Sequence, residues 1–143
     1  MSLNAAFRVS IKVMQLMLCC VCIALVVYTI PGNFSESVLQ YITYGGYIII
    51  VIGAIVGLAT RDPIPKKVEL VFLLTAVVLQ VAAGSCCIHH ARRRTSWPAH
   101  YSNGRDVSYA CGSLAIINAG FFLLDAVLAV FEDEEYRVAS QRG

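Results

Sequence analysis

Residues 41–59, YITYGGYIIIVIGAIVGLA, form an apolar stretch that contains no charged side chain. An α-helix needs about 20 residues to cross the roughly 30 Å of hydrocarbon in a bilayer, and this stretch has close to that length. Three further apolar runs flank it, at Val13–Ile30, Val68–Ile88 and Val107–Phe131. The sequence therefore predicts four membrane-spanning segments.

The composition indicates one integral membrane domain over residues 1–143. Hydrophobic residues make up 58% of the chain and charged residues 14%, and the mean hydropathy is +0.70, which leaves too little polar surface for a soluble globular domain. Helices are expected rather than a barrel, because the runs lack polar alternation and lipid requires internal backbone hydrogen bonds. A net charge of +2 is too small to indicate a nucleic-acid partner.

Short connections between the runs predict an all-α, four-helix transmembrane bundle with up-down-up-down topology. Both termini are predicted to be cytoplasmic, because seven Lys and Arg residues then lie inside and four outside, in line with the positive-inside bias. The outer triplet Arg92–Arg94 runs against that bias.

Asn33 begins a formal N-glycosylation triplet in the first outer loop. The first run is expected to be a span rather than a cleaved signal peptide, because it is long and no small-x-small site follows it.

Small residues are concentrated in the second and fourth runs. The spacing Gly53-x-x-x-Gly57, with Gly46 on the same helical face, lets two backbones approach closely in a membrane. The fourth run offers a similar groove at Gly112, Ala115 and Ala119. We favour helix contact inside one bundle over contact between subunits, but the spacing fits both, and a homo-oligomer stays open.

Polar side chains within the runs are few, namely Gln15, Gln80, Asn118 and Asp125. Each is expected to face protein, because an unpaired amide or carboxylate in hydrocarbon is costly. For Asp125 we favour a structural ion pair over a place in an ion or proton path, since a path needs several ionisable groups in line. The candidate partners are Lys12, Arg61 and Lys66.

The cysteines fall into two groups. Those of the first run are expected to fill space, with palmitoylation as the weaker alternative: Cys19, Cys20 and Cys22. Near the outer ends of the third and fourth runs, a disulfide from Cys86 or Cys87 to Cys111 is a hypothesis for an oxidising compartment.

No cofactor or metal is expected. The cluster Cys86-Cys87-Ile88-His89-His90 matches no standard zinc spacing. The sequence also contains no phosphate loop and no nucleophile with a matching base, so we expect that the protein is not an enzyme.

A family resemblance rests on the fourth run, which begins Gly112-Ser113-Leu114 and ends Leu123-Leu124-Asp125-Ala126-Val127-Leu128-Ala129. From Gly112 to Ala129 the chain resembles the last helix of the Snakeskin-like family, small four-span proteins of arthropod smooth septate junctions. Four spans, short loops and a basic first inner loop are also similar to that MARVEL-like class. The Arg92–Arg94 triplet and the acidic run Glu132-Asp133-Glu134-Glu135 after the fourth span depart from the family pattern, which suggests a relative with a different tissue or task.

The resemblance implies a structural protein of the plasma membrane at lateral cell–cell contacts. Such a protein would support an epithelial barrier through lateral association with other junction membrane proteins. A second class of function stays open from the residues alone, an accessory subunit of a transporter or a small channel. That alternative requires Gln80, Asn118 and Asp125 to line one continuous aqueous path.

Overall fold

Four long helices make up the computed structural model, which describes residues 3–28, 34–60, 64–93 and 102–141. They are α1 (Leu3–Tyr28), α2 (Phe34–Thr60), α3 (Lys66–Arg93) and α4 (Ser102–Gln141). Each contains a segment long and apolar enough to cross a membrane. The predicted all-α bundle of four membrane-spanning helices is confirmed.

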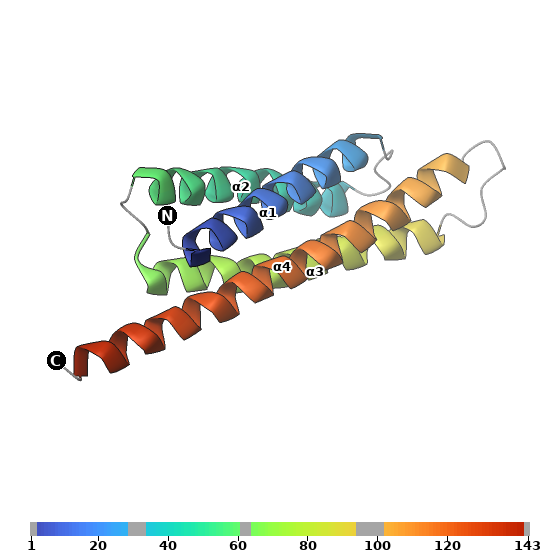
Figure 1. Cartoon of the computed structure of the whole chain (residues 1–143). Helices are drawn as coiled ribbons and strands as arrows, with labels where there is room; N and C mark the ends of the chain where they lie inside the picture. Colours follow the sequence, from blue (N-terminus) through green and yellow to red (C-terminus); the bar gives the residue numbers. More distant parts are fainter. Residues whose placement is uncertain (1–2, 29–33, 61–63, 94–101, 142–143) are drawn as a thin grey trace.

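The chain runs up and down through the bundle, so that α1 begins at the end of the bundle where α4 finishes (Figure 1). The most extensive contact joins α3 to α4. Helix α1 contacts both α2 and α4, whereas the contact between α2 and α3 is the smallest of these four pairs. Helix α2 is therefore held mainly by α1.

The first helix starts well before the apolar run that predicted it. It begins at Leu3 rather than at Val13, so Arg8 and Lys12 are part of the helix instead of preceding it. At the other end of the chain, α4 continues past Phe131 to Gln141. The apolar runs correctly located the centre of each helix. The helices themselves continue beyond the runs, because a helical backbone does not require apolar side chains.

The start of α3 is fixed by proline. The carbonyl oxygen of Pro65 accepts backbone hydrogen bonds from Val68 and Glu69 at 2.9 and 3.0 Å. Because proline lacks an N–H and holds φ near the helical value, it suits the entry to a helix. This turn directs Glu69 to the interior, where it is 8% exposed.

Buried positions recur at alternating spacings of three and four, which is the pattern of helices packed as in coiled coils and up-down bundles. The pattern is longest in α4, at Ser108, Cys111, Ala115, Asn118, Phe122, Asp125 and Ala129. In α1 it includes Lys12, Gln15, Cys19, Cys22 and Val26. Small and polar residues therefore occupy the interior positions that apolar residues fill in soluble bundles.

The outer surface has the opposite character. Large apolar side chains point away from the bundle, with exposed fractions of 73% for Ile49, 67% for Val78 and 62% for Phe131. Since lipid tails are as apolar as these side chains, helices in a bilayer associate through close packing and polar contacts. The exposed surface is suited to hydrocarbon, and the interior provides the specific contacts.

Helices α3 and α4 meet backbone to backbone at two glycines. A Cβ atom added to Gly112 would lie 2.8 Å from the carbonyl oxygen of Gly84 and 2.7 Å from Cγ1 of Ile88. A Cβ atom added to Gly84 would lie 2.9 Å from the carbonyl oxygen of Gly112 and 3.2 Å from Cβ of Ala115. Neither position accepts a side chain unless the helices move apart.

The glycines of α2 are arranged differently. Gly53 is exposed and Gly46 is half-buried, and a Cβ atom on either would meet nothing within 4 Å. Helix α2 instead turns Tyr44, Tyr47 and Val51 into the core. The interpretation that favoured packing of this glycine face inside one bundle is therefore wrong for Gly46 and Gly53; Gly57 is half-buried.

Candidate functional site: a buried ion cluster

Four charged side chains meet in the interior near the end where α1 begins. This ion cluster consists of Arg8 and Lys12 of α1, Glu69 of α3 and Asp125 of α4. Lys12 Nζ lies 2.9 Å from both Glu69 Oε1 and Asp125 Oδ2. Arg8 Nη2 lies 3.0 Å from Glu69 Oε1, and Arg8 Nε lies 3.9 Å from Asp125 Oδ1. Two cations therefore oppose two carboxylates, and the cluster carries no formal net charge.

The ion cluster lies within the part of the bundle suited to the membrane. Lys12 is 2% exposed and Asp125 is fully buried. An isolated charge at such a position is expensive, and removing one partner of a buried pair leaves the other uncompensated. Because its members come from three helices, the cluster specifies how α1, α3 and α4 fit together.

Gln15 extends the ion cluster by one helical turn. Its Nε2 donates to the carbonyl oxygen of Phe121 at 3.2 Å and to Asp125 Oδ2 at 3.4 Å. Asp125 Oδ2 thus accepts from both Lys12 and Gln15 on α1. These contacts fix the axial position of α1 relative to α4.

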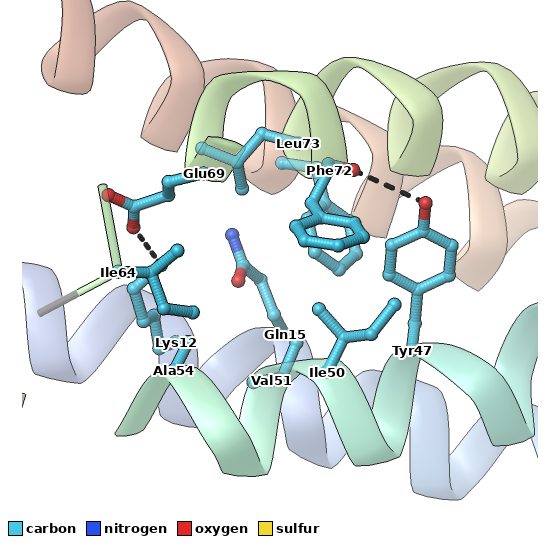
Figure 2. A pocket seen from close by; sticks show the side chains of 11 residues that line it. Lys12, Gln15, Tyr47, Ile50, Val51, Ala54, Ile64, Glu69, Phe72 and Leu73 are labelled. Carbon is cyan, nitrogen blue, oxygen red and sulfur yellow. Dashed lines mark hydrogen bonds and ion pairs between the residues drawn. The ribbon is translucent and has the colours of Figure 1, made fainter. Parts of the chain in front are cut away.

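A small cavity of about 20 Å³ borders the ion cluster, since Lys12 and Glu69 both line it. Residues of α1, α2 and α3 make up most of its lining, and Phe122 of α4 also contributes. Figure 2 shows the amide of Gln15 reaching into it, with Glu69 and Leu73 of α3 facing Val51 and Ile50 of α2. Gln15 Oε1 is buried and makes no hydrogen bond within the described part of the chain. The volume suits about one water molecule and is far below that of a small-molecule site.

Aromatic contacts tie α2 to the other helices next to this cavity. Tyr47 donates a hydrogen bond from its hydroxyl to the carbonyl oxygen of Phe72 at 3.2 Å (Figure 2). Its ring packs edge-on against Phe122 of α4, with the centroids 5.5 Å apart. These contacts attach α2 to α3 and α4, although α2 has little other contact with α3.

A second polar layer lies further along the interior. Cys19 Sγ accepts hydrogen bonds from Gln80 Nε2 at 3.4 Å and from Asn118 Nδ2 at 3.2 Å. All three side chains have an exposed fraction of 0%. Gln80 and Asn118, predicted to face protein, therefore meet at one sulfur of α1.

A third layer contains thiols and a tyrosine. Cys87 Sγ lies 3.8 Å from Cys111 Sγ, and Cys111 Sγ lies 3.9 Å from the hydroxyl of Tyr44. Cys22 and Cys111 each approach the backbone carbonyl oxygen of the other, at 3.9 and 3.7 Å. All six cysteines are free thiols in the structure. The hypothesised disulfide between Cys87 and Cys111 is therefore not formed, although the two sulfurs are neighbours.

The ion pair expected for Asp125 is present, and Lys12 is its partner. Arg61, one of the other candidates, lies outside the described residues, as does Asn33 with its glycosylation triplet. Among the described residues, no group of three His, Cys, Asp or Glu side chains is placed to hold a metal ion. The two carboxylates of the cluster are both engaged by Lys12.

Sequence reasoning missed Arg8 and Glu69 as interior residues. Both stand at the edge of an apolar run, where a charge normally indicates the membrane surface. Heptad spacing could have found Glu69, because positions 69, 73, 76 and 80 continue the interior face that Gln80 marks. Arg8 likewise stands four residues before Lys12 and seven before Gln15, on one face of α1.

Comparisons with protein-family models, with curated proteins and with solved structures find no match to this chain. Its function must therefore be inferred from its own residues.

Proposed function

We propose that this chain is a non-enzymatic integral membrane protein that supports the assembly or barrier function of an epithelial, septate-type cell junction. It acts at lateral contacts of the plasma membrane, with both termini in the cytoplasm, through helix–helix association within the bilayer. The observation that carries the proposal is the contrast between buried charges that pair with one another inside the bundle and a glycine face of α2 that is open toward the outside at Gly53.

The closed interior supports a structural role. Asp125 is neutralised by Lys12, and the amides of Gln80 and Asn118 both donate to Cys19. A transporter subunit or channel would need these three polar residues along one aqueous path. The cavity beside Gln15 includes none of them among its lining residues, so this alternative has less support.

The open face of α2 supports lateral association. Gly53 is exposed, and the space where its Cβ would lie contains no other atom within 4 Å. In a bilayer, a small-x-x-x-small face allows a second helix to approach closely. The partner helix comes from another copy of the chain or from another junction protein.

The junctional assignment rests on the resemblance of residues 112–129 to the Snakeskin-like family. The residues that carry the resemblance also have defined contacts. Asp125 belongs to the ion cluster, and Gly112 touches the backbone of Gly84. The resemblance therefore includes positions that determine the bundle, which apolar composition alone would not require.

Localisation of the tagged full-length protein in an epithelium that forms septate junctions tests the proposal. We expect the protein to concentrate at lateral cell contacts and its depletion to increase paracellular leakage of a fluorescent dextran. Even distribution over the apical surface, or an unchanged barrier after depletion, would refute the junctional function.

A pair of α2 variants tests the surface that carries the association. Gly53→Leu fills the open face, and we expect it to fold normally but to lose recovery of co-expressed partners after cross-linking in the membrane. Ile52→Ala is the matched control, because Ile52 is exposed on the same helix but lies about 100° around the helix from Gly53. Equal cross-linking yields for the Gly53 variant and the wild type would exclude this face as the contact surface.

A further inference from the structure

Three thiols from three helices come together in the half of the bundle that is remote from the ion cluster. Cys22, Cys87 and Cys111 are each at most 4% exposed. The sulfurs of Cys87 and Cys111 face each other across 3.8 Å. Cys22 also contacts Cys111: each sulfur lies near the backbone carbonyl oxygen of the other residue, and the two side chains interact. Within the described part of the chain, the ion pairs of the ion cluster involve none of these residues.

The backbones of α3 and α4 are already close enough for a covalent link at this level. Next to Cys111, a Cβ atom on Gly112 would lie 3.3 Å from Cβ of Cys87. A disulfide has an S–S bond of about 2.05 Å and joins Cβ atoms about 3.5–4.5 Å apart. The two sulfurs, 3.8 Å apart, therefore need to approach each other by less than about 2 Å to reach the length of a disulfide bond.

The pair lies below the surface of the membrane but not at its centre. Cys87 stands six residues before Arg93, the last residue of α3, and six residues of helix span about 9 Å. In the proposed topology this is the outer end of the bundle, which faces an oxidising compartment. A small neutral oxidant can reach such a depth, whereas a protein oxidoreductase cannot.

We propose that Cys87 and Cys111 form an oxidisable thiol pair that a small peroxide converts into an intramolecular disulfide between α3 and α4. One thiol is first oxidised by hydrogen peroxide to a sulfenic acid, which releases one water. The second sulfur then attacks the sulfenic sulfur, the S–S bond forms, and the hydroxyl leaves as a second water with the proton of the attacking thiol. Two electrons pass from the sulfurs to the peroxide.

The disulfide would join the two helices that already share the most extensive contact, so oxidation stabilises the existing arrangement rather than creating a new one. Once Cys111 is bonded to Cys87, Cys22 stays a thiol, because Cys111 can bond to only one sulfur. Oxidised and reduced forms of the protein then differ in how easily α3 and α4 separate.

Mass spectrometry of the full-length protein in lipid vesicles treated with hydrogen peroxide tests the inference. We expect the intact mass to fall by two hydrogen atoms and two fewer of the six cysteines to react with N-ethylmaleimide after denaturation. Digestion should yield a peptide pair linked through Cys87 and Cys111 that separates on reduction.

Substitutions of neighbouring cysteines provide matched controls. Cys87→Ala should abolish the linked peptide, whereas Cys86→Ala, one residue away, should leave its yield unchanged. The wild-type peptide map is informative even if a variant folds poorly. Six reactive thiols after peroxide treatment, a link through Cys22 or Cys86 instead, or links only between separate chains would overturn the proposal.

Discussion

The interior and the outer surface of this bundle use the same helices in opposite ways. Inside, α4 presents Gly112, Asn118 and Asp125 to specific partners. Outside, the same helix presents Ile117, Leu123 and Gly120, which are exposed. Lipid rewards all apolar side chains alike, so the outer surface cannot define one helix arrangement. The few small and polar contacts inside therefore define the fold.

The largest effect is expected from breaking the ion cluster. Asp125→Ala leaves Lys12 buried with Glu69 as its remaining close carboxylate, and loss of one partner from a buried pair costs about 3–5 kcal/mol. We expect a marked fall in the thermal unfolding midpoint in detergent and poor delivery to the cell surface. Leu124→Ala, an exposed change one residue away, should have little effect.

The size of that effect comes from the uncompensated charge. The double variant Lys12→Met with Asp125→Leu removes both charges and should regain much of the lost stability, because apolar residues of similar volume often replace a buried pair without loss. An unfolding midpoint of Asp125→Ala equal to that of the wild type would contradict the structural role of the cluster.

Two glycines of α4 provide the sharpest comparison between interior and exterior. Gly112→Ala places a methyl group against the backbone of Gly84 and should destabilise the bundle by about 1–3 kcal/mol, the usual cost of overpacking. Gly120→Ala meets nothing within 4 Å and should be neutral or stabilise the helix by up to about 1 kcal/mol. Thermal unfolding of the two variants side by side measures the difference, and equal midpoints would mean that the contact with α3 is not close.

A smaller effect is expected from the tie between α2 and α3. Tyr47→Phe removes the hydroxyl that donates to the carbonyl oxygen of Phe72 but keeps the ring against Phe122. A single hydrogen bond contributes about 0.5–1.5 kcal/mol, so the unfolding midpoint should fall slightly. Hydrogen exchange of the variant is compared with that of the wild type. A larger increase in α2 than in α4 would show that α2 loosens, whereas an equal increase in all helices would argue that this hydrogen bond does not hold α2 in particular.

The smallest effect on stability is expected at the outer face of α2. Gly53→Leu adds a side chain into open space, so the free energy of unfolding of the single chain should stay the same or rise by up to about 1 kcal/mol, as for Gly120→Ala. Unfolding of the purified monomer in detergent measures this change. A large loss of stability would mean that Gly53 packs inside the bundle after all.

Much of the fold could be predicted from the residues because the physics of the bilayer is restrictive. A run such as residues 41–59 has to be helical in lipid, where no water satisfies the backbone. The inward orientation of Gln15, Gln80, Asn118 and Asp125 followed from the same cost. The helix ends were less predictable, because Arg8 and Lys12 gave α1 a charged segment that hydropathy treats as loop.

The candidate site could be predicted only in part. One charge of the ion cluster, Asp125, interrupts an apolar run and was therefore visible, and Lys12 was among its candidate partners. Glu69 stands two residues after the pair Lys66-Lys67 in sequence, at the edge of the apolar run, so a position at the membrane surface was the natural interpretation. Its inward direction depends on how α3 rotates against α1.

The sequence alone determined that this protein has four membrane-spanning helices and that their polar groups avoid lipid, because both follow from the cost of unsatisfied hydrogen bonds and charges in hydrocarbon. The tertiary structure decided which face of each helix is interior: Gly84 and Gly112 touch, Gly53 faces outward, and Lys12 joins Glu69 to Asp125. Hydrophobicity cannot make that choice, since the outside of a membrane bundle is as apolar as any core. The interior face of each helix is decided by how all four helices pack against one another.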